Sequence, residues 1–581
     1  MSQIIQKLKL RVGVFITVFV LAFSLCAMAE ETKTSHENVA VKSGHDKWWK
    51  DAKFGLFINW NPSCLLGGEI SWSRSAPRLG LEAKYNWPPY SGGIPVEIYD
   101  NLYKMFNPSQ FDANEWVAIT QAAGMKYIVF DVRHHDGFSM YDTKLDDYKI
   151  TNTPFKRDIT AELAKACSQR GMKLGLYYSQ VNWHHPDWNA QNLDRYIEYM
   201  HGQVREICTN YGEVAILWFD GICGDGKIWQ SKKLIEMIRK LQPDIMINDR
   251  SGDSSFDFNT AESHVGSWQI DHPWETCMTL GDNWNWKAND TLKPFEQCLK
   301  LLVNCTGSGG NFLLDVAPMP TGQFEPRQIE ILTKMGDWLR KYGESIYGTR
   351  AGPFKPTACM VSTRKDDTIY VHVLDWQGSE VIHLSPIEKK IIASSLLTGG
   401  AVEVNQSDEV IKIRVPKDLQ QEVDTIIVLK LNGPAADITP RDATPAKFVQ
   451  VSDDRQKINE KKSQAAQTNL NRSPMKRYGM AIKVKPDKLE SYKKEHAAVW
   501  PKVLEMISKC NIKNYSIYYK DGYLFSYFEY TGSDFDADMA KMAADPTTQK
   551  WWALCKPFQE PLPTRAEGEW WANMEEVFHL D

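Results

Sequence analysis

Short apolar segments typical of buried strands alternate with helical segments over the N-terminal part of the chain. Strand candidates begin at residues 127, 174, 215 and 245, and each follows a helical stretch. This alternation is typical of parallel strands joined by helices. Polar residues recur at nearly every strand end, and no glycine-rich phosphate loop follows the first strand. We therefore predict an α/β fold, a (β/α)8 TIM-like barrel rather than an open doubly wound sheet.

The segment 215–221, AILWFDG, indicates where chemistry takes place. Its continuous apolar run predicts a strand buried on both faces, since a strand with one solvated face would alternate. The run stops at Asp220, at the strand end where parallel barrels carry their active sites. A role for Asp220 as the cap of a following helix or turn is equally consistent with this segment taken alone.

Changes in composition divide the 581 residues into five segments. Residues 1–29 read as a secretory signal, with basic residues, an apolar run and a small-x-small cleavage site, so we expect an exported protein, periplasmic or secreted. We predict the barrel over 46–350, an antiparallel β-sandwich over 351–432, a polar linker over 433–475 and a ferredoxin-like α+β domain over 476–581. Strands six and seven of the barrel have no clear pattern within residues 251–291.

Charge and cysteine patterns exclude several function classes. The net charge is −5 with dispersed basic residues, so we expect no nucleic-acid partner. No stretch after the signal is long and apolar enough for a membrane span. No CxxC pair or Cys/His cluster is present, so we predict neither a metal site nor a cofactor. The 21 Trp and 23 Tyr residues suit stacking on sugar rings, but also ordinary core packing.

Polar side chains cluster at the predicted strand ends of the barrel. They include Asn59, His134, His135, Tyr178, Trp218, Asp220 and Arg250, and Glu262 and Glu275 follow in the region without a clear strand pattern. Two carboxylates that flank one site are the minimal equipment for cleaving a glycosidic bond. Adjacent residues of a strand point to opposite faces, so we expect at most one of His134 and His135 to face the site.

A series of motifs in order resembles one glycosidase family. They are FGLFINW (54–60), RHHDGF (133–138), NTPFKRD (152–158), LGLYYS (174–179), LWFDG (217–221), FNTAE (258–262), WETCMT (274–279) and GGNFLLDVAP (309–318). Together they are similar to the retaining α-L-fucosidases of glycoside hydrolase family 29. The resemblance extends over about residues 46–350, and the β domain that follows is similar in placement.

The resemblance implies a role for each matching position. Asp220 is the implied nucleophile, which forms a covalent fucosyl-enzyme. Glu262 matches the acid/base of one branch of the family and Glu275 that of another, and the sequence does not choose between them. Whichever it is, the acid must stay protonated, so its pKa has to be raised by an apolar wall or by the charge of Asp220.

The implied sugar-holding residues are His134, His135, Tyr178, Trp218 and Arg250. Asn59 stands where many relatives carry a histidine, and it leaves the sugar preference open. The loop that follows, with Glu69, Trp72 and Arg74, also departs from the family pattern, which leaves linkage and aglycone choice open.

The C-terminal residues 477–581 resemble an L-rhamnose mutarotase. The matching stretches are SYKKEHAAVWPKV (491–503), NYSIYY (514–519), QKWW (549–552) and MEEVFHLD (574–581). The resemblance implies His496 as proton donor, and Tyr492, Tyr515, Trp551 and Trp552 as sugar contacts. Tyr492 and His496 are spaced to share one face of a helix, predicted over residues 488–510. The alternative is that these residues form an ordinary amphipathic core.

The leading hypothesis is an exported retaining hydrolase that removes terminal α-L-fucose from fucosylated glycans, with anomer exchange of the free 6-deoxy sugar by the C-terminal domain. One alternative, motivated by Asn59, is a hydrolase for a related sugar such as α-L-galactose. Another is a non-catalytic glycan-binding protein with a dimerising C-terminal module. In each case the C-terminal domain is the candidate surface for a homodimer.

Overall fold

The chain forms two compact units, residues 1–445 and residues 446–581. The computed structural model describes residues 44–68, 71–74, 94–189, 191–221, 226–444, 476–532, 534–566 and 569–574. The predicted signal at 1–29 and most of the predicted linker lie outside these residues. Among the described residues, no helix combines the length and the apolar character needed to cross a membrane.

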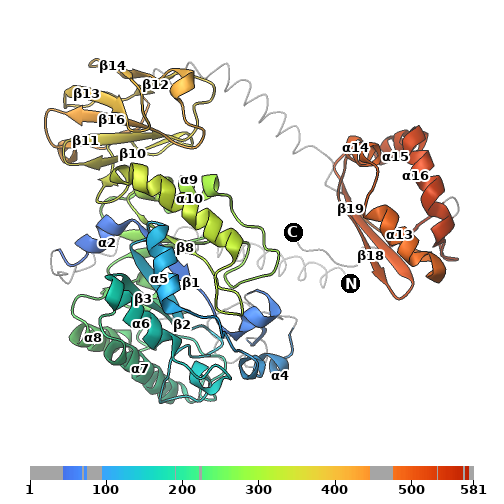
Figure 1. The fold of residues 1–581 in the computed structure, drawn as a ribbon, viewed down its shortest axis with the longest axis horizontal. Helices are drawn as coiled ribbons and strands as arrows, with labels where there is room; N and C mark the ends of the chain where they lie inside the picture. Colours follow the sequence, from blue (N-terminus) through green and yellow to red (C-terminus); the bar gives the residue numbers. More distant parts are fainter. Residues whose placement is uncertain are drawn as a thin grey trace, which may run out of the picture. The chain divides into compact units, whose positions relative to one another are not determined.

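The first unit contains an eight-stranded parallel sheet with the order β5-β4-β3-β2-β1-β8-β7-β6 (Figure 1). Its strands are β1 (Phe54–Ile58), β2 (Tyr127–Arg133), β3 (Lys173–Ser179), β4 (Ile216–Asp220), β5 (Met246–Ile247), β6 (Asn259–Glu262), β7 (Trp274–Thr279) and β8 (Asn311–Asp315). A parallel bridge between Asn248 and Phe258 joins the two ends of the sheet, next to β5 and β6. The predicted TIM-like barrel is confirmed, and Asp220 is the last residue of β4.

The two strands that the sequence did not place are β6 and β7. β6 has four residues, NTAE, none of them buried, so it shows no apolar pattern. Within the described residues, only the short turn of 3-10 helix Asp249–Ser251 separates β5 from β6, and no helix separates β6 from β7. The alternation that identifies the other strands is therefore absent from this part of the barrel.

Helices α5 (Ala113–Ala122), α6 (Ile159–Arg170), α7 (Leu193–Asn210), α8 (Ser231–Leu241), α9 (Phe295–Gly307) and α10 (Pro326–Tyr342) follow the strands (Figure 1). Their ends agree with local sequence signals. The Asp158 side chain accepts a hydrogen bond from the Ala161 N–H at the start of α6, and Gly171 takes a left-handed conformation at its end. These caps fix the chain direction into and out of the helix.

Large aromatic side chains fill the interior of the barrel. Phe57, Tyr127, Tyr177 and Trp218 belong to one buried cluster enclosed by the strands. Tyr127 fits only because Gly55 of the neighbouring strand has no side chain, since a Cβ there would lie 2.3 Å from the Tyr127 ring. Strands β1 and β2 are buried on both faces, as their continuous apolar runs predict.

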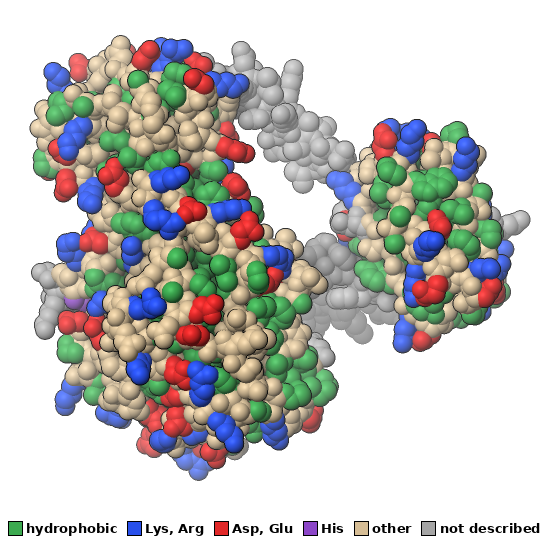
Figure 2. All heavy atoms as spheres, in the orientation of Figure 1, with side chains coloured by type: hydrophobic (Ala, Val, Ile, Leu, Met, Phe, Trp, Pro, Cys, Tyr) green, Lys and Arg blue, Asp and Glu red, His purple; other side chains and the backbone are tan. Residues whose placement is uncertain are grey.

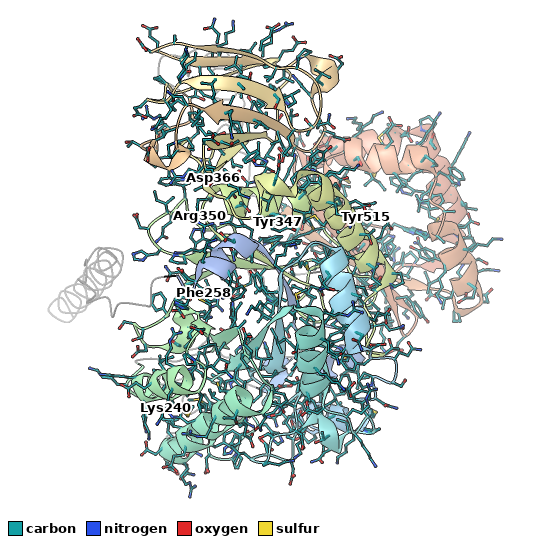
Figure 3. All side chains as sticks on the ribbon, turned by 60° about the vertical axis from the view of Figure 1, so that its left-hand side comes forward. Lys240, Phe258, Tyr347, Arg350, Asp366 and Tyr515 are labelled. Atoms are coloured by element: carbon teal, nitrogen blue, oxygen red, sulfur yellow. The ribbon has the colours of Figure 1, made fainter. Side chains whose placement is uncertain are left out.

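A β domain follows the barrel within the same unit. Its larger sheet has the order β13-β16-β11-β10-β9 and its smaller sheet β12-β15-β14. The strands are β9 (Arg350–Ala351), β10 (Met360–Lys365), β11 (Thr368–Val373), β12 (Val381–Leu384), β13 (Ile391–Leu396), β14 (Glu403–Gln406), β15 (Ile411–Arg414) and β16 (Thr425–Leu431). Figure 3 labels Tyr347, Arg350 and Asp366 near the junction of this domain with the barrel. Val361 of β10 belongs to the core cluster of the barrel.

The second unit has an antiparallel sheet in the order β18-β19-β17-β20, with β21 also paired to β17. Its elements are β17 (Lys476–Val484), α13 (Leu489–His496), α14 (Pro501–Lys509), β18 (Ile512–Lys520), β19 (Tyr523–Tyr530), α15 (Phe535–Ala544), α16 (Pro546–Cys555), β20 (Gln559–Glu560) and β21 (Ala572–Met574). This is the predicted α+β type. Figure 2 shows acidic and basic side chains interspersed over the visible face of each unit.

The single helix predicted over residues 488–510 is wrong. Two helices are present, and the second begins at Pro501, with Trp500 in an extended conformation before it. Proline disfavours helical geometry in Trp500, the residue before it, so the second helix cannot extend backward, while the first helix already ends at His496. Helix α16, which carries Trp551 and Trp552, was not predicted, and a final strand expected near Val577 lies outside the described residues.

Candidate active site

A cavity of about 220 Å³ opens at the carboxyl ends of the barrel strands. It is lined by Phe57, Asn59, His134, His135, Tyr177, Trp218, Asp220, Gly221, Arg250, Glu262, Cys277 and Trp284. The structure thus brings most of the barrel residues singled out from the sequence into one place. Tyr178 and Glu275 are the two that do not line the cavity.

Asp220 is held as a carboxylate by its neighbours. Arg250 Nη1 donates to its Oδ1 at 2.9 Å, and the Tyr177 hydroxyl donates to its Oδ2 at 2.8 Å. Burial alone would raise the pKa of Asp220, but the charge of Arg250 and these hydrogen bonds outweigh it and hold the pKa at about 2. The cavity therefore presents a fixed negative charge near neutral pH.

Arg250 connects Asp220 to the second carboxylate of the cavity. Its Nη2 donates to Glu262 Oε2 at 2.8 Å, while Nη1 bonds Asp220. Arg250 Nε also donates to the Thr260 hydroxyl at 3.0 Å, which orients the guanidinium plane. One rigid fork therefore places two carboxylates on the same side of the cavity. The Glu262 side chain is 43% exposed, so it lies where the cavity opens to solvent.

Both histidines of the RHHDGF motif line the cavity, so the expectation that at most one would face it is wrong. Strand β2 ends at Arg133, and the alternation of side chains no longer applies to the turn that follows. His135 Nδ1 lies 2.6 Å from Ser179 Oγ, and its Nε2 lies 3.7 Å from Asp220 Oδ2. Burial and the nearby His134 lower the pKa of His135 to about 3, so it is neutral.

Tyr177, rather than Tyr178, faces the cavity. In the parallel register, Tyr177 pairs with Trp218 and Ser179 with Asp220, so these four side chains share the inner face. Tyr178 points to the outer face, where its hydroxyl donates to Gln203 and its ring lies against Arg133. Strand alternation counted back from Asp220 is the sequence signal that identifies Tyr177.

Glu275 lies inside the barrel and has no exposed surface. Its Oε1 accepts a hydrogen bond from Trp218 Nε1 at 3.3 Å, and its Oε2 accepts one from the Tyr127 hydroxyl. Burial raises the pKa of Glu275 to about 7, in spite of these two hydrogen bonds. The raised pKa is the one expected of a general acid, but the carboxyl is separated from the cavity by the Trp218 ring.

The C-terminal unit gathers its predicted residues around one helix end. The rings of Tyr492 and His496 stack at 3.9 Å, and the edge of Trp551 meets His496 at 5.3 Å. His496 Nδ1 lies 3.0 Å from the Tyr492 carbonyl oxygen. Because a carbonyl only accepts, Nδ1 carries the proton and Nε2 keeps a free lone pair. Burial lowers the pKa of His496, which favours this neutral form.

The other two predicted residues of that unit occupy neighbouring positions. Trp552 follows Trp551 on α16 and packs in the adjacent core clusters, while Tyr515 on β18 packs edge-on against Phe528. Burial and the nearby Tyr515 raise the pKa of Tyr492, so its phenol keeps its proton.

Comparison with known families agrees with this geometry. The family described as alpha-L-fucosidase matches residues 21–344, more than half of the chain. The chain belongs to the α-L-fucosidase family. The family described as L-rhamnose mutarotase matches residues 477–580, so this fucosidase also carries a mutarotase domain at its C-terminus.

Individual relatives support the assignment. The chain is 27% identical over 332 residues to an α-L-fucosidase of Dictyostelium discoideum, covering 52% of this chain and 71% of the relative. It is 28% identical over 371 residues to human plasma α-L-fucosidase, covering 58% and 78%. Among solved structures, α-L-fucosidase isoenzyme 1 from Paenibacillus thiaminolyticus superposes with a TM-score of 0.61 at 33% identity, covering 68% of this chain and 100% of that one.

Asn59 and the loop with Glu69, Trp72 and Arg74 are the places where the resemblance implies a departure from the family pattern. Asn59 lines the cavity, and its Oδ1 is buried with no hydrogen-bond partner among the described residues, so it is available to accept a bond from a sugar hydroxyl. Its backbone N–H donates to Asp315 Oδ1 at 3.1 Å, which fixes its place. Arg74 is fully buried and paired with Asp100, so it supports the loop from within. Glu69 lies outside the described residues, and of the Trp72 side chain nothing is described.

The raised pKa of Glu275 predicts a pH-dependent stability. Its folded pKa of about 7 exceeds its ordinary value of 4.5, so the wild type should lose free energy of unfolding as pH rises between these values. The loss should be about 3 kcal/mol. Glu275→Gln cannot ionise and should not show this loss. Denaturant unfolding at pH 4.5 and pH 8 measures it, with surface Glu213→Gln as the control for charge removal. Equal pH dependence in all three proteins would contradict the prediction.

Proposed function

We propose that this protein is an exported, retaining α-L-fucosidase that removes terminal α-L-fucose from glycans, with Asp220 as nucleophile and Glu262 as acid/base. The observation that carries the proposal is that both carboxylates contact the same Arg250 guanidinium inside one cavity. A solved relative from Bacteroides thetaiotaomicron, 26% identical with a TM-score of 0.59, is described as a trapped covalent intermediate with 2-fluoro-fucosyl fluoride. That supports a covalent, retaining route here.

In the first step, an oxygen of Asp220 forms a bond to the anomeric carbon as the glycosidic bond breaks. Glu262, which has to leave the Arg250 ion pair and take up a proton before this step, gives that proton to the leaving oxygen. In the second step, the Glu262 carboxylate takes a proton from water, whose oxygen bonds to the anomeric carbon and displaces Asp220. Two inversions release fucose in its original α configuration. Asp220 suits the first role because Arg250 and Tyr177 keep it ionised.

Glu262 is preferred over Glu275 on geometry. A general acid must come within hydrogen-bond reach of the leaving oxygen. Glu262 lines the cavity at its open end, where the aglycone leaves. Glu275 has no exposed surface, and both of its oxygens already accept hydrogen bonds from within the barrel.

Azide rescue of variants tests these roles on an aryl α-L-fucoside with a good leaving group. Asp220→Gly should lose activity by at least about a thousandfold, and azide should restore turnover with inverted β-L-fucosyl azide as product. Glu262→Ala should accumulate the fucosyl-enzyme, and azide should give the α-azide. The product configuration is read by NMR. Absence of hydrolysis in the wild type would favour a glycan-binding protein, and an α-L-galactoside cleaved in preference would favour the related-sugar alternative suggested by Asn59.

We further propose that the C-terminal domain exchanges the anomers of the released 6-deoxy sugar. Ring opening needs a proton taken from the anomeric hydroxyl and one given to the ring oxygen. His496 suits the first of these transfers because its Nε2 keeps a lone pair while Nδ1–H is held by the Tyr492 carbonyl, so in this tautomer it takes a proton, whereas the resemblance implied a proton donor. The Tyr492 ring, whose phenol keeps its proton, and the Trp551 indole both lie against the His496 ring.

Saturation-transfer NMR of α-L-fucose with the full-length protein tests this second activity. The wild type should exchange anomers faster than buffer, and His496→Asn should lose about a hundredfold of the enhancement. Asp220→Ala, which removes hydrolysis, is the matched control and should keep the full exchange rate. L-Rhamnose in parallel shows which 6-deoxy sugar is preferred. No enhancement with either sugar would refute the proposed activity.

The outer face of the C-terminal sheet favours self-association. Tyr518 and Phe525 are paired across strands on the face opposite the helices, and Tyr518 and Tyr523 keep 62% and 37% exposure. We propose a second copy of the chain as the partner, because two-fold dimers, in which the same surface of both copies meets, are the commonest oligomers of soluble proteins. Light scattering should give a dimer mass for the wild type and a monomer mass for Tyr518→Lys. A monomeric wild type at micromolar concentration would contradict this.

A further inference from the structure

We propose that Glu275 is a positioning residue for fucoside hydrolysis. It anchors the Trp218 indole, and the indole ring holds the Arg250 guanidinium where it bonds Asp220 and Glu262. The proposal rests on the roles proposed for Asp220 and Glu262. It gives Glu275 a function that does not require contact with the sugar.

The anchor is a hydrogen bond inside the barrel, between two side chains with almost no exposed surface. Trp218 Nε1 donates to Glu275 Oε1 at 3.3 Å, and the indole of Trp218 is only 1% exposed. The second oxygen of Glu275 accepts from Tyr127, whose ring is fixed over Gly55. Glu275 is therefore clamped between two aromatic donors from β4 and β2, and its own position is well defined.

The ring of Trp218 contacts the two residues that donate to Asp220. The Arg250 guanidinium carbon lies 4.8 Å from the centre of the Trp218 ring, and the Tyr177 ring stacks on it at 5.6 Å. Arg250 and Tyr177 are the two residues that donate to Asp220. A rotation of the indole would therefore shift both donors of the nucleophile, and with Arg250 also Glu262.

The ionisation of Glu275 adjusts this anchor. The titratable groups that face it are Tyr127, Cys277 and Cys305, whose pKa values are all raised and which are therefore uncharged near neutral pH. Burial raises the pKa of Glu275 to about 7, and the groups that lower this pKa are uncharged hydrogen-bond donors. An anionic acceptor binds the indole N–H more strongly than a neutral one. The anchor should tighten as the pH rises through 7.

Glu275→Gln tests the proposal, because the amide keeps the shape and an acceptor but never carries a charge. At pH 8 we expect kcat/KM for an aryl α-L-fucoside to fall about tenfold, as for the loss of a charged hydrogen bond. At pH 5.5, where the wild-type group is neutral, the two proteins should differ by less than about threefold. A merely structural role would give the same ratio at both pH values, and that result would overturn the proposal.

A double-mutant cycle with Trp218→Phe isolates the contact. Phenylalanine has no N–H, so adding Glu275→Gln to Trp218→Phe should cause no further loss of kcat/KM. Full additivity of the two losses would show that Glu275 does not act through Trp218.

The leaving group separates this proposal from the assignment of the general acid. A positioning residue should cost the same factor for a 2,4-dinitrophenyl and an unactivated phenyl fucoside, whereas loss of the acid should cost far more with the poorer leaving group. We expect the first pattern for Glu275→Gln and the second for Glu262→Gln. The opposite assignment, with azide rescue of Glu275→Ala, would overturn both the positioning role and the proposed role of Glu262. Failure of the pH or cycle test alone would leave Glu262 in place.

Discussion

The site is built around one guanidinium. Arg250 bonds Asp220 and Glu262 through separate nitrogens and lies over the ring of Trp218. The planar fork fixes both carboxylates at once, which a flexible ammonium would not do. Arg250 itself comes from the short turn after β5, and its Nε is held by Thr260 at the start of β6. The joint between the two ends of the sheet thus carries the group that keeps Asp220 ionised.

Asp220 and Glu275 belong to the same barrel and have opposite pKa shifts, and their neighbours explain the difference. Asp220 has a cation and two hydrogen-bond donors, which hold its pKa at about 2. Glu275 has donors but no cation, and burial raises its pKa to about 7. In the proposed roles, Asp220 must be ionised to attack the sugar, whereas Glu275 only supports the site, so the two carboxyls need different neighbours. The Trp218 indole connects the two environments, because its N–H donates to Glu275 and its ring lies against the Arg250 guanidinium that bonds Asp220.

The candidate site of the C-terminal unit is a histidine enclosed by aromatic side chains. Its sheet packs α13 and α16 so that one imidazole is enclosed by Tyr492 and Trp551. The backbone carbonyl of Tyr492 fixes the tautomer of His496, and burial keeps the ring neutral. A retaining hydrolase releases one anomer of its sugar, so an exchange activity on the same chain would return that sugar to its equilibrium mixture. This link between the two units follows from the stereochemistry of the proposed reaction.

The sequence by itself determined the barrel, the end of β4 at Asp220 and the family, because continuous apolar runs, helix caps and ordered motifs are local features. It also placed Tyr492 and His496 on one helical face. Strand β6 was beyond its reach, since four unburied residues have no periodicity, and the break before Pro501 was overlooked. Tyr177 could have been found by counting alternation back from Asp220. Only the tertiary structure separated Glu262 from Glu275, because both occur in motifs that the resemblance matches to an acid/base. What distinguishes them is whether the side chain reaches the cavity or the closed interior, and that depends on which strands close the barrel around it.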